Sequence, residues 1–306
     1  MKTAFTVGVV GNPNCGKTTL FNTLTGSRHQ VGNWPGVTVE KKMGRYQYQD
    51  LEITLVDLPG TYSLESEDDS VSLDEKIARD YVAAREADLI INIVDGSNIE
   101  RNLYLSSQLF EMRVPMIMVL NMMDAVQRQG VVIDHKLLAE QLACPVVPVS
   151  AASGKGISEL LAIINQACKD KPTPKLDVLY HPAIESAVSK LMTEINPENS
   201  NARWLALRLI ENDTLALQLC PTSILDNLEN IRLDIEESAG EEIDILAADA
   251  RYGLVNELVS TCVHKQNQVS KNTTERIDNI VLNRYLGIPI FLLVMYSMFM
   301  FTINIG

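Results

Sequence analysis

The sequence predicts an α/β fold, a doubly wound and mostly parallel sheet, followed by an all-α helical domain and a membrane-entering helix. Three observations support this prediction. Strand-like and helix-like segments alternate over residues 4–168, only helix-like segments follow a proline-containing linker, and the last 22 of the 306 residues carry no charge. We therefore divide the chain into an α/β domain (1–168), the linker (169–178), a helical domain (179–270), a juxtamembrane segment (271–284) and the start of a transmembrane helix (285–306).

The expected strands are apolar runs, such as LIINIV at 89–94, and not alternating patterns. Continuous apolar runs are typical of strands buried on both faces of a parallel sheet. Because the segments 39–49 and 52–57 follow each other closely, we expect them to form an antiparallel hairpin at the edge of the sheet. The remaining expected strands are 5–10, 116–120 and 146–149, and the expected helices are 17–25, 73–84, 100–112, 136–142 and 157–168.

The first expected strand leads into the pattern G-x-x-x-x-G-K-S/T, which reads Gly11-Asn12-Pro13-Asn14-Cys15-Gly16-Lys17-Thr18 and continues with Thr19. A loop wrapped around phosphates points successive backbone N–H groups inward, which requires glycine where a side chain would collide. The helix that we expect from Lys17 adds its positive N-terminal dipole. Lys17 can reach the β- and γ-phosphates of a nucleotide, and Thr18 can ligate Mg²⁺. The strand and the helix on either side argue against a chance glycine turn.

Four further signals lie after strands, in the order that a guanine-nucleotide-binding (G) domain requires. They are Thr38 in the loop 31–38, Asp57-Leu58-Pro59-Gly60, Asn121-Met122-Met123-Asp124 and Ser150-Ala151-Ala152. Each short motif arises readily by chance, but their order and their placement at strand ends make the set specific. The α/β domain is therefore predicted to be a P-loop G domain that binds GTP or GDP.

Each of these motifs suits one part of GTP. Asp57 can hold Mg²⁺ through water, Thr38 can supply the ion with a second hydroxyl, and the Gly60 N–H can bond the γ-phosphate. The Asp124 carboxylate can accept both the ring N–H and the exocyclic amine of guanine, a donor pair that adenine lacks. A backbone N–H of residues 150–152 can bond the guanine O6, and Asn121 and Met122 complete the base-binding motif.

The net charge of −13 argues against nucleic acid as a partner, because phosphate binding needs a basic face. Five scattered cysteines without a C-x-x-C pair are typical of reduced thiols. Much of the acidity lies in residues 177–270, which hold 16 acidic and 6 basic residues. A solvated surface, a partner-docking face and a cation-attracting surface are all compatible with this concentration. Within this region we expect helices at 180–194, 202–218, 223–238 and 243–267.

The uncharged run 285–306 is long enough, at ~1.5 Å per residue, to span a bilayer core of ~30 Å. We interpret it as a transmembrane helix cut at its end, and a buried core helix is the alternative. Lys265, Lys271, Arg276 and Arg284 precede the run, so the positive-inside rule predicts that residues 1–284 lie in the cytosol.

Three stretches resemble the bacterial ferrous iron transport protein B (FeoB) family: GNWPGVT at 32–38, DLPGTYSL at 57–64 and LNRYLGIPIF at 282–291. The resemblance covers the whole chain. It implies a cytosolic GTPase with a GDI-like helical domain, fused to a bacterial inner-membrane domain that moves Fe²⁺ inward and binds it outside these residues. It implies the chain's own C-terminal membrane domain as a partner, with small FeoA- and FeoC-like cytosolic proteins and a homo-oligomer as further candidates.

Two residues depart from the pattern of Ras-like GTPases. Met122 stands where many of them have a lysine against the nucleotide, which predicts weaker binding and faster exchange, and core packing is the alternative. Thr61 stands where Ras-type enzymes have a water-orienting glutamine, so we expect Thr61 to be a turn residue. No arginine finger is evident, since Arg28 is interpreted as a surface charge. Hydrolysis is therefore expected to be slow.

Asn14 matches a position that ligates K⁺ in cation-activated relatives. A K⁺ ion there could stabilise the charge that an arginine finger otherwise meets, and a turn residue with positive φ is the alternative. We expect Asn14, Lys17, Thr38 and Gly60 to act in catalysis. GTP with Mg²⁺ is expected to order the loops 27–38 and 58–73, and hydrolysis to release them.

Two other functions remain open. A general NTPase driving the same transporter is compatible with the weak base-recognition signal of Met122 and of Ala151-Ala152. A soluble Era-like GTPase assembly factor that acts on RNA would need a basic appendage, whereas this chain has an acidic helical domain and an apolar tail.

Overall fold

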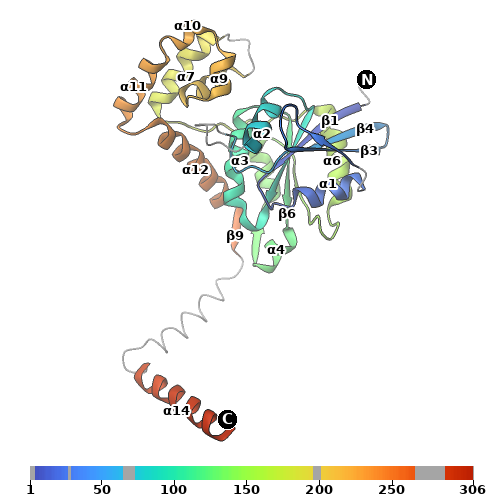
Figure 1. Ribbon diagram of the computed structural model, residues 1–306, viewed down its shortest axis with the longest axis vertical. Helices are drawn as coiled ribbons and strands as arrows, with labels where there is room; N and C mark the ends of the chain where they lie inside the picture. Colours follow the sequence, from blue (N-terminus) through green and yellow to red (C-terminus); the bar gives the residue numbers. More distant parts are fainter. Residues whose placement is uncertain (1–3, 27–28, 65–72, 196–200, 266–286, 306) are drawn as a thin grey trace. The chain divides into compact units, whose positions relative to one another are not determined.

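The computed structural model describes residues 4–26, 29–64, 73–195, 201–265 and 287–305 (Figure 1). These residues belong to two compact units, one formed by Met1–Gln129 with Ile133–Val263 and the other by Gly130–Val132 with His264–Gly306. The predicted juxtamembrane segment 271–284 and Arg28 lie outside the described residues.

The first unit is built on a seven-stranded sheet with the strand order β2-β3-β4-β1-β5-β6-β8. Neighbouring strands from β4 to β8 are parallel, whereas β3 runs antiparallel to β4 and β2 antiparallel to β3. The doubly wound, mostly parallel sheet predicted from the sequence is therefore confirmed. The strands are β1 (Ala4–Gly11), β2 (His29–Asn33), β3 (Glu40–Tyr48), β4 (Leu51–Asp57), β5 (Leu89–Asp95), β6 (Met116–Asn121) and β8 (Val146–Pro148), and β7 (Val131–Ile133) pairs separately with β9 (Val263–Lys265).

The predicted hairpin of β3 and β4 is confirmed as an antiparallel pair, but its place at the sheet edge is wrong. The edge strand is β2, which pairs with β3 from His29↔Gly44 to Asn33↔Glu40. Every residue of β2 is exposed, so the strand carries none of the apolar pattern by which buried strands are recognised.

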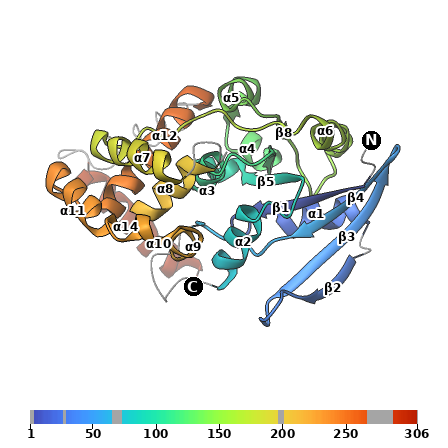
Figure 2. The ribbon, with the colours of Figure 1, turned by 90° about the horizontal axis from the view of Figure 1, so that it is seen from above.

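Helices cover both faces of the sheet (Figure 2). The side chains of Val7 and Val9 share one core cluster with residues of α1 and α6. Gly8 faces the opposite side, because a Cβ there would lie 3.2 Å from the ring of Tyr81 in α2. The helices of this α/β part are α1 (Lys17–Thr25), α2 (Leu73–Ala83), α3 (Ile99–Glu111), α4 (Met123–Arg128), α5 (His135–Leu142) and α6 (Ile157–Asp170), with a 3₁₀ turn at Gly96–Asn98.

The helical region differs from the prediction at three points. The helix expected over 202–218 is broken, since Asn212 adopts a φ of 60° and Asp213 caps a new helix by accepting the Leu215 N–H at 2.8 Å. The helix expected over 223–238 is also divided, and that expected over 243–267 ends where β9 begins. The helices are α7 (Pro182–Ile195), α8 (Ala202–Ile210), α9 (Thr214–Leu219), α10 (Thr222–Leu225), α11 (Leu228–Ala239) and α12 (Ile243–Cys262).

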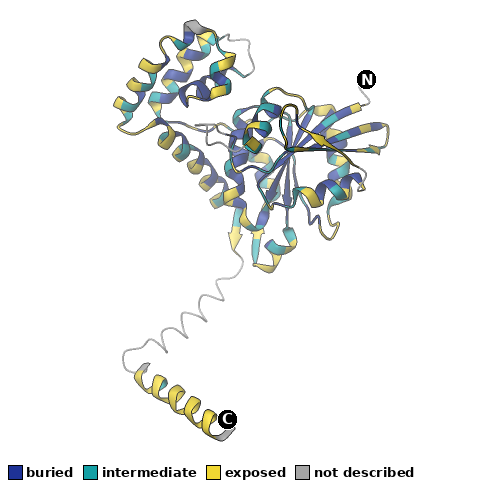
Figure 3. Cartoon of the chain, viewed as in Figure 1, coloured by how far each residue is buried: buried dark blue, intermediate teal, exposed yellow. Residues whose placement is uncertain are grey.

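The C-terminal run forms the helix α14 (Gly287–Ile305), whose large apolar side chains are exposed (Figure 3). Within the described ranges, no helix combines the length and the apolar character needed to cross a membrane, and the membrane-entering helix expected over 285–306 stays a prediction.

Buried charges fasten the helical region to the α/β part. Glu111, the last residue of α3, accepts from Arg208 of α8 at 2.7 Å and from Arg251 of α12 at 3.1 Å. Arg79 of α2 donates to Asp213, the cap of α9, at 2.8 Å. These five side chains are each 2–3% exposed, so their charges are compensated almost without solvent.

We predict that Glu111→Gln lowers the free energy of unfolding by about 3 kcal/mol at pH 7, because an amide cannot compensate the buried guanidinium groups. Burial raises the pKa of Glu111, but the guanidinium groups of Arg251 and Arg208 together hold it below the ordinary value of 4.5. The stabilisation by this carboxylate is therefore complete above pH 4.5 and is lost as the pH falls through the folded-state pKa. Urea unfolding at several pH values should show the two proteins converging in acid.

Glu185→Gln is the matched control, because Glu185 forms a half-exposed pair with Arg203 at 2.7 Å. This variant should lower the free energy of unfolding by less than about 1 kcal/mol. The prediction would be contradicted if Glu111→Gln lowered the free energy of unfolding no more than Glu185→Gln does, or by an amount that does not change with pH.

Candidate functional site

The predicted site residues gather at the carboxyl edge of the sheet, where parallel strands place their following loops together. Gly11 ends β1, Asp57 ends β4 and Asn121 ends β6, while Ser150 follows β8. The register places Val9 beside Asp57 and Asp95 beside Asn121. Loops more than a hundred residues apart in sequence therefore meet at one edge.

The phosphate loop has the strained turn that its glycines were expected to permit. Gly16 precedes α1 with a φ of 88°, and a Cβ on Gly11 would lie 2.6 Å from the Ile93 carbonyl oxygen. Asn14 also adopts a positive φ, 66°, and its side chain is exposed, so it has the geometry of a turn residue. Thr18 and Thr19 lie in the first turn of α1 with exposed side chains.

Asn121 joins the phosphate loop to the loop at 150–152. Its Nδ2 donates to the Cys15 carbonyl at 2.9 Å, and its Oδ1 accepts the Ala151 N–H at 3.0 Å. The side chain is 3% exposed, so these two bonds fix its orientation in the interior. A Cβ on Gly16 would lie only 2.2 Å from Nδ2, which shows how closely the amide approaches the loop.

Lys17 and Asp57 form an ion pair, with Lys17 Nζ 3.0 Å from Asp57 Oδ1. Both side chains are largely shielded from solvent, which strengthens the attraction relative to a surface pair. Carboxylate and hydroxyl oxygens are ligands that Mg²⁺ prefers, and Thr18 directly follows Lys17. Thr18 and Asp57 are thus residues that could hold a magnesium ion.

The structure does not bring Thr38 into contact with Lys17, Thr18 or Asp57. Thr38 is exposed in the loop between β2 and β3, and in the described part of the chain its hydroxyl has no hydrogen bond to the phosphate loop or Asp57. The same loop is anchored by Trp34, which is 6% exposed and packs edge-on against Tyr81 of α2 at 5.5 Å between ring centroids. Lys41 covers the Trp34 ring at 4.2 Å.

The segment after Asp57 is held against the phosphate loop. A Cβ on Gly60 would lie 3.4 Å from Pro13, and the Thr61 N–H donates to the Gly11 carbonyl at 3.4 Å. The Thr61 hydroxyl shares its hydrogen between the Ser63 carbonyl and the Glu75 carboxylate, so Thr61 has the turn role expected for it.

Gln108 of α3 holds the segment after Asp57, a contact that the sequence did not predict. Its side chain is 1% exposed, and its Oε1 accepts the Leu64 N–H at 2.6 Å while its Nε2 donates to Ser63 at 2.9 Å. The sequence offered no distinct signal, because α3 also buries the polar side chains of Asn102, Ser106 and Ser107. Through Gln108, the segment after Asp57 is tied to the helix that ends at Glu111.

The base-recognition residues form the other end of the site. The Asp124 N–H donates to Ser150 Oγ at 3.1 Å, and its carboxylate is exposed and pairs with Arg128 at 2.9 Å. Met122 has a φ of 60° and is half-buried beside Gly16, so it is not a core residue. The N–H groups of Ser150 and Ala151 are bonded within the protein, and Ala152 offers an N–H without a partner in the described residues.

Cys15 is buried in the phosphate loop, and this burial raises the pKa of its thiol to about 11. The thiol is therefore protonated at neutral pH and lacks the thiolate character of a redox-sensing cysteine.

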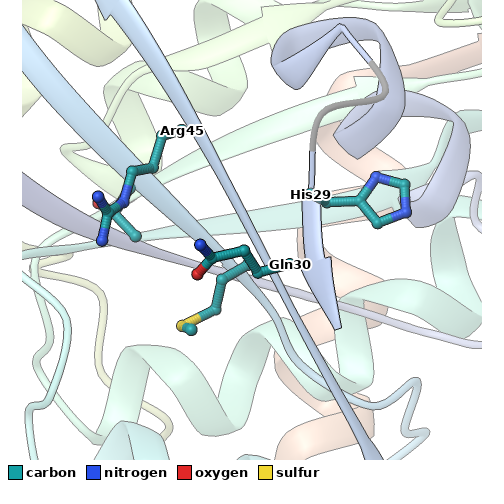
Figure 4. Close-up of a pocket in the computed structure, with 5 residues that line it drawn as sticks. His29, Gln30 and Arg45 are labelled. Carbon is teal, nitrogen blue, oxygen red and sulfur yellow. The ribbon is translucent and has the colours of Figure 1, made fainter. Parts of the chain in front are cut away.

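A pocket of about 360 Å³ lies on β2, β3 and β4, lined by His29, Gln30, Met43, Arg45 and Thr54 (Figure 4). None of the predicted site residues lines it. Within the described residues, no cluster of three or more His, Cys, Asp or Glu side chains is placed to hold a metal ion.

We predict that Gly16→Ala destabilises the protein for two separable reasons. The φ of 88° costs a residue with a Cβ about 1 kcal/mol, and the new Cβ would also collide with Asn121. In an Asn121→Ala background the collision disappears, so a double-mutant cycle from urea unfolding should give a coupling of at least about 1 kcal/mol. Gly154→Ala is the control, because Gly154 has a φ of 73° with no atom within 4 Å of its Cβ position. Additive effects of the two substitutions would exclude the close contact.

Solved structures with this architecture come from several bacteria. The cytosolic domain of L. pneumophila FeoB is 38% identical with a TM-score of 0.72, covering 85% of this chain and 100% of that one. A variant of S. thermophilus NFeoB bound to GDP is 35% identical with a TM-score of 0.75 and the same coverage. The T. maritima FeoB cytosolic domain in its GMPPNP form is 33% identical, with a TM-score of 0.73, covering 85% of this chain and 99% of that one.

Sequence comparison leads to the same proteins. The Fe(2+) transporter FeoB of Escherichia coli K12 is 42% identical over 308 residues, which covers 98% of this chain and 39% of the relative. The chain thus spans about two-fifths of the length of such curated relatives. The profile described as ferrous iron transport protein B matches residues 5–164, and that of the FeoB cytosolic helical domain matches residues 180–264. The chain belongs to the ferrous iron transport protein B (FeoB) family.

Proposed function

We propose that this chain binds GTP with Mg²⁺, hydrolyses it slowly to GDP, and uses this cycle to regulate a ferrous iron transporter of which it is a part. The observation that carries the proposal is the pair of hydrogen bonds that the Asn121 side chain makes to the backbone of Cys15 and of Ala151. One buried side chain thereby fixes the distance between a phosphate loop and a base-binding loop. Such a fixed distance suits a single nucleotide spanning both loops.

The phosphate end supplies positive charge and backbone donors. On binding, Lys17 would exchange Asp57 for the β- and γ-phosphates, and Asp57 would turn to the magnesium ion beside Thr18. Mg²⁺ would neutralise part of the negative charge of the phosphates. Each group of the ion pair then meets a new opposite charge, so little electrostatic stabilisation is lost in the exchange. Relatives described in GDP and GMPPNP forms support this assignment.

The loop that contains Thr38 would be the moving part. Thr38 can reach the magnesium ion only if this loop changes its path, and Trp34 anchors the loop against α2. Gly60 already lies beside Pro13, where its N–H can meet the γ-phosphate. We infer that GTP reorganises the Thr38 loop more than the Gly60 segment.

The relatives named as Fe(2+) transporters support iron uptake as the purpose of the cycle. The transported Fe²⁺ would bind outside residues 1–306, in a membrane domain of the same protein in the bacterial inner membrane, with residues 1–284 in the cytosol. FeoA- and FeoC-like proteins and a second copy of the chain are the proposed partners. A general NTPase that drives the same transporter is the second candidate, because Met122 replaces the usual lysine beside the base.

Asp124 separates the two candidates. We predict that Asp124→Asn weakens GTP binding at least tenfold, because the amide cannot accept both guanine donors, and leaves ATP turnover unchanged. Parallel GTP and ATP kinetics of wild type, Asp124→Asn and Lys17→Ala would test this, with Asp170→Asn on the exposed end of α6 as the control. Lys17→Ala should abolish binding of both nucleotides. Equal GTP and ATP turnover in the wild type would establish the general NTPase, and unchanged binding by Lys17→Ala would refute the site itself.

Asn14 is the proposed ligand of an activating K⁺ ion, beside the phosphates, in place of an arginine finger. Glycine tolerates the φ of 66° at this position but has no side-chain oxygen. We predict that Asn14→Gly keeps GDP affinity within about twofold and loses any stimulation of kcat by K⁺ over Na⁺. If the stimulation survives in Asn14→Gly, the residue serves the turn alone.

A further inference from the structure

Asn12 is a buried amide in the phosphate loop that has no hydrogen-bond partner. The side chain is 3% exposed, and neither its Oδ1 nor its Nδ2 has a partner in the described part of the chain. Its backbone carbonyl, in contrast, accepts the Cys15 N–H at 3.3 Å. Buried polar side chains are satisfied in the great majority of cases, so an amide with both ends unpaired needs a physical explanation.

Asn12 directly follows β1 and lies between two residues that contact the segment after Asp57. Both neighbours of Asn12 touch this segment: the Gly11 carbonyl accepts the Thr61 N–H, and Pro13 lies against Gly60.

We propose that Asn12 is a positioning residue for the triphosphate state. When the Gly60 N–H meets the terminal phosphate of GTP, the Asn12 amide hydrogen-bonds to the backbone of the segment 58–61 and holds Gly60 in place. GDP offers Gly60 no terminal phosphate, so Asn12 stays unpaired. The inference rests on the proposed binding of GTP and GDP. It assigns to Asn12 the discrimination between them, acting through Gly60.

The test compares the affinities of GDP and of GMPPNP, measured by calorimetry on the full chain. Asn12→Ala should weaken GMPPNP binding about tenfold and leave GDP binding within about twofold, since only the triphosphate state uses the amide. Asn12→Ser, which keeps a short donor and acceptor, should recover part of the loss. Without nucleotide, Asn12→Ala should melt no lower than wild type, because the substitution removes an unpaired polar group from the interior.

Asn165→Ala is the matched control. Asn165 on α6 is also a buried asparagine with an unpaired Oδ1, but it bonds Gln49 at the turn between β3 and β4, at the other end of the sheet. Its substitution should leave the ratio of the two affinities unchanged. Equal effects of Asn12→Ala on both nucleotides, or no effect on GMPPNP, would overturn the inference while leaving the nucleotide site intact. Wild-type protein that binds neither nucleotide would overturn the proposed function itself.

Discussion

The site depends on one buried amide. Asn121 occupies the end of β6, and its two hydrogen bonds hold the loops after β1 and β8 at a fixed separation. Its close approach explains why position 16 lacks a side chain, since a Cβ there would occupy the space of Nδ2. The glycine of the phosphate loop thus serves the base side of the site as well as the phosphates. Asn121 was predicted as part of a base-recognition motif, and in the fold its side chain connects the phosphate loop to the loop at 150–152.

Two groups of contacts connect this site to the rest of the molecule. The segment after Asp57 is bonded to Gln108 of α3 and, through Thr61, to Glu75 of α2. Those two helices also carry Arg79 and Glu111, the residues that pair with the helical region. Short contacts therefore connect this segment to α8, α9 and α12 through α2 and α3.

The sequence predicted the central strands and the loops of the site because both follow local rules. Apolar runs mark strands buried on both faces, and parallel pairing then places Lys17, Asp57 and Asn121 at one edge. The parts that were missed are not marked by apolar periodicity. β2 is wholly exposed, and the break at Asn212 interrupts an apolar helical period. The bonds of Glu111 to Arg208 and Arg251 join residues 97 and 140 positions apart, where no spacing in the chain indicates a partner.

The buried pairs made by Arg79 and Glu111 restrict how the helical region can respond to the site. Breaking any of these pairs is costly in an environment that excludes water, although each guanidinium group keeps a second carboxylate, which is Asp80 for Arg79 and Glu211 for Arg208 and Arg251. Displacement of α8, α9 or α12 against α2 and α3 has to break buried ion pairs, so the junction is stiff.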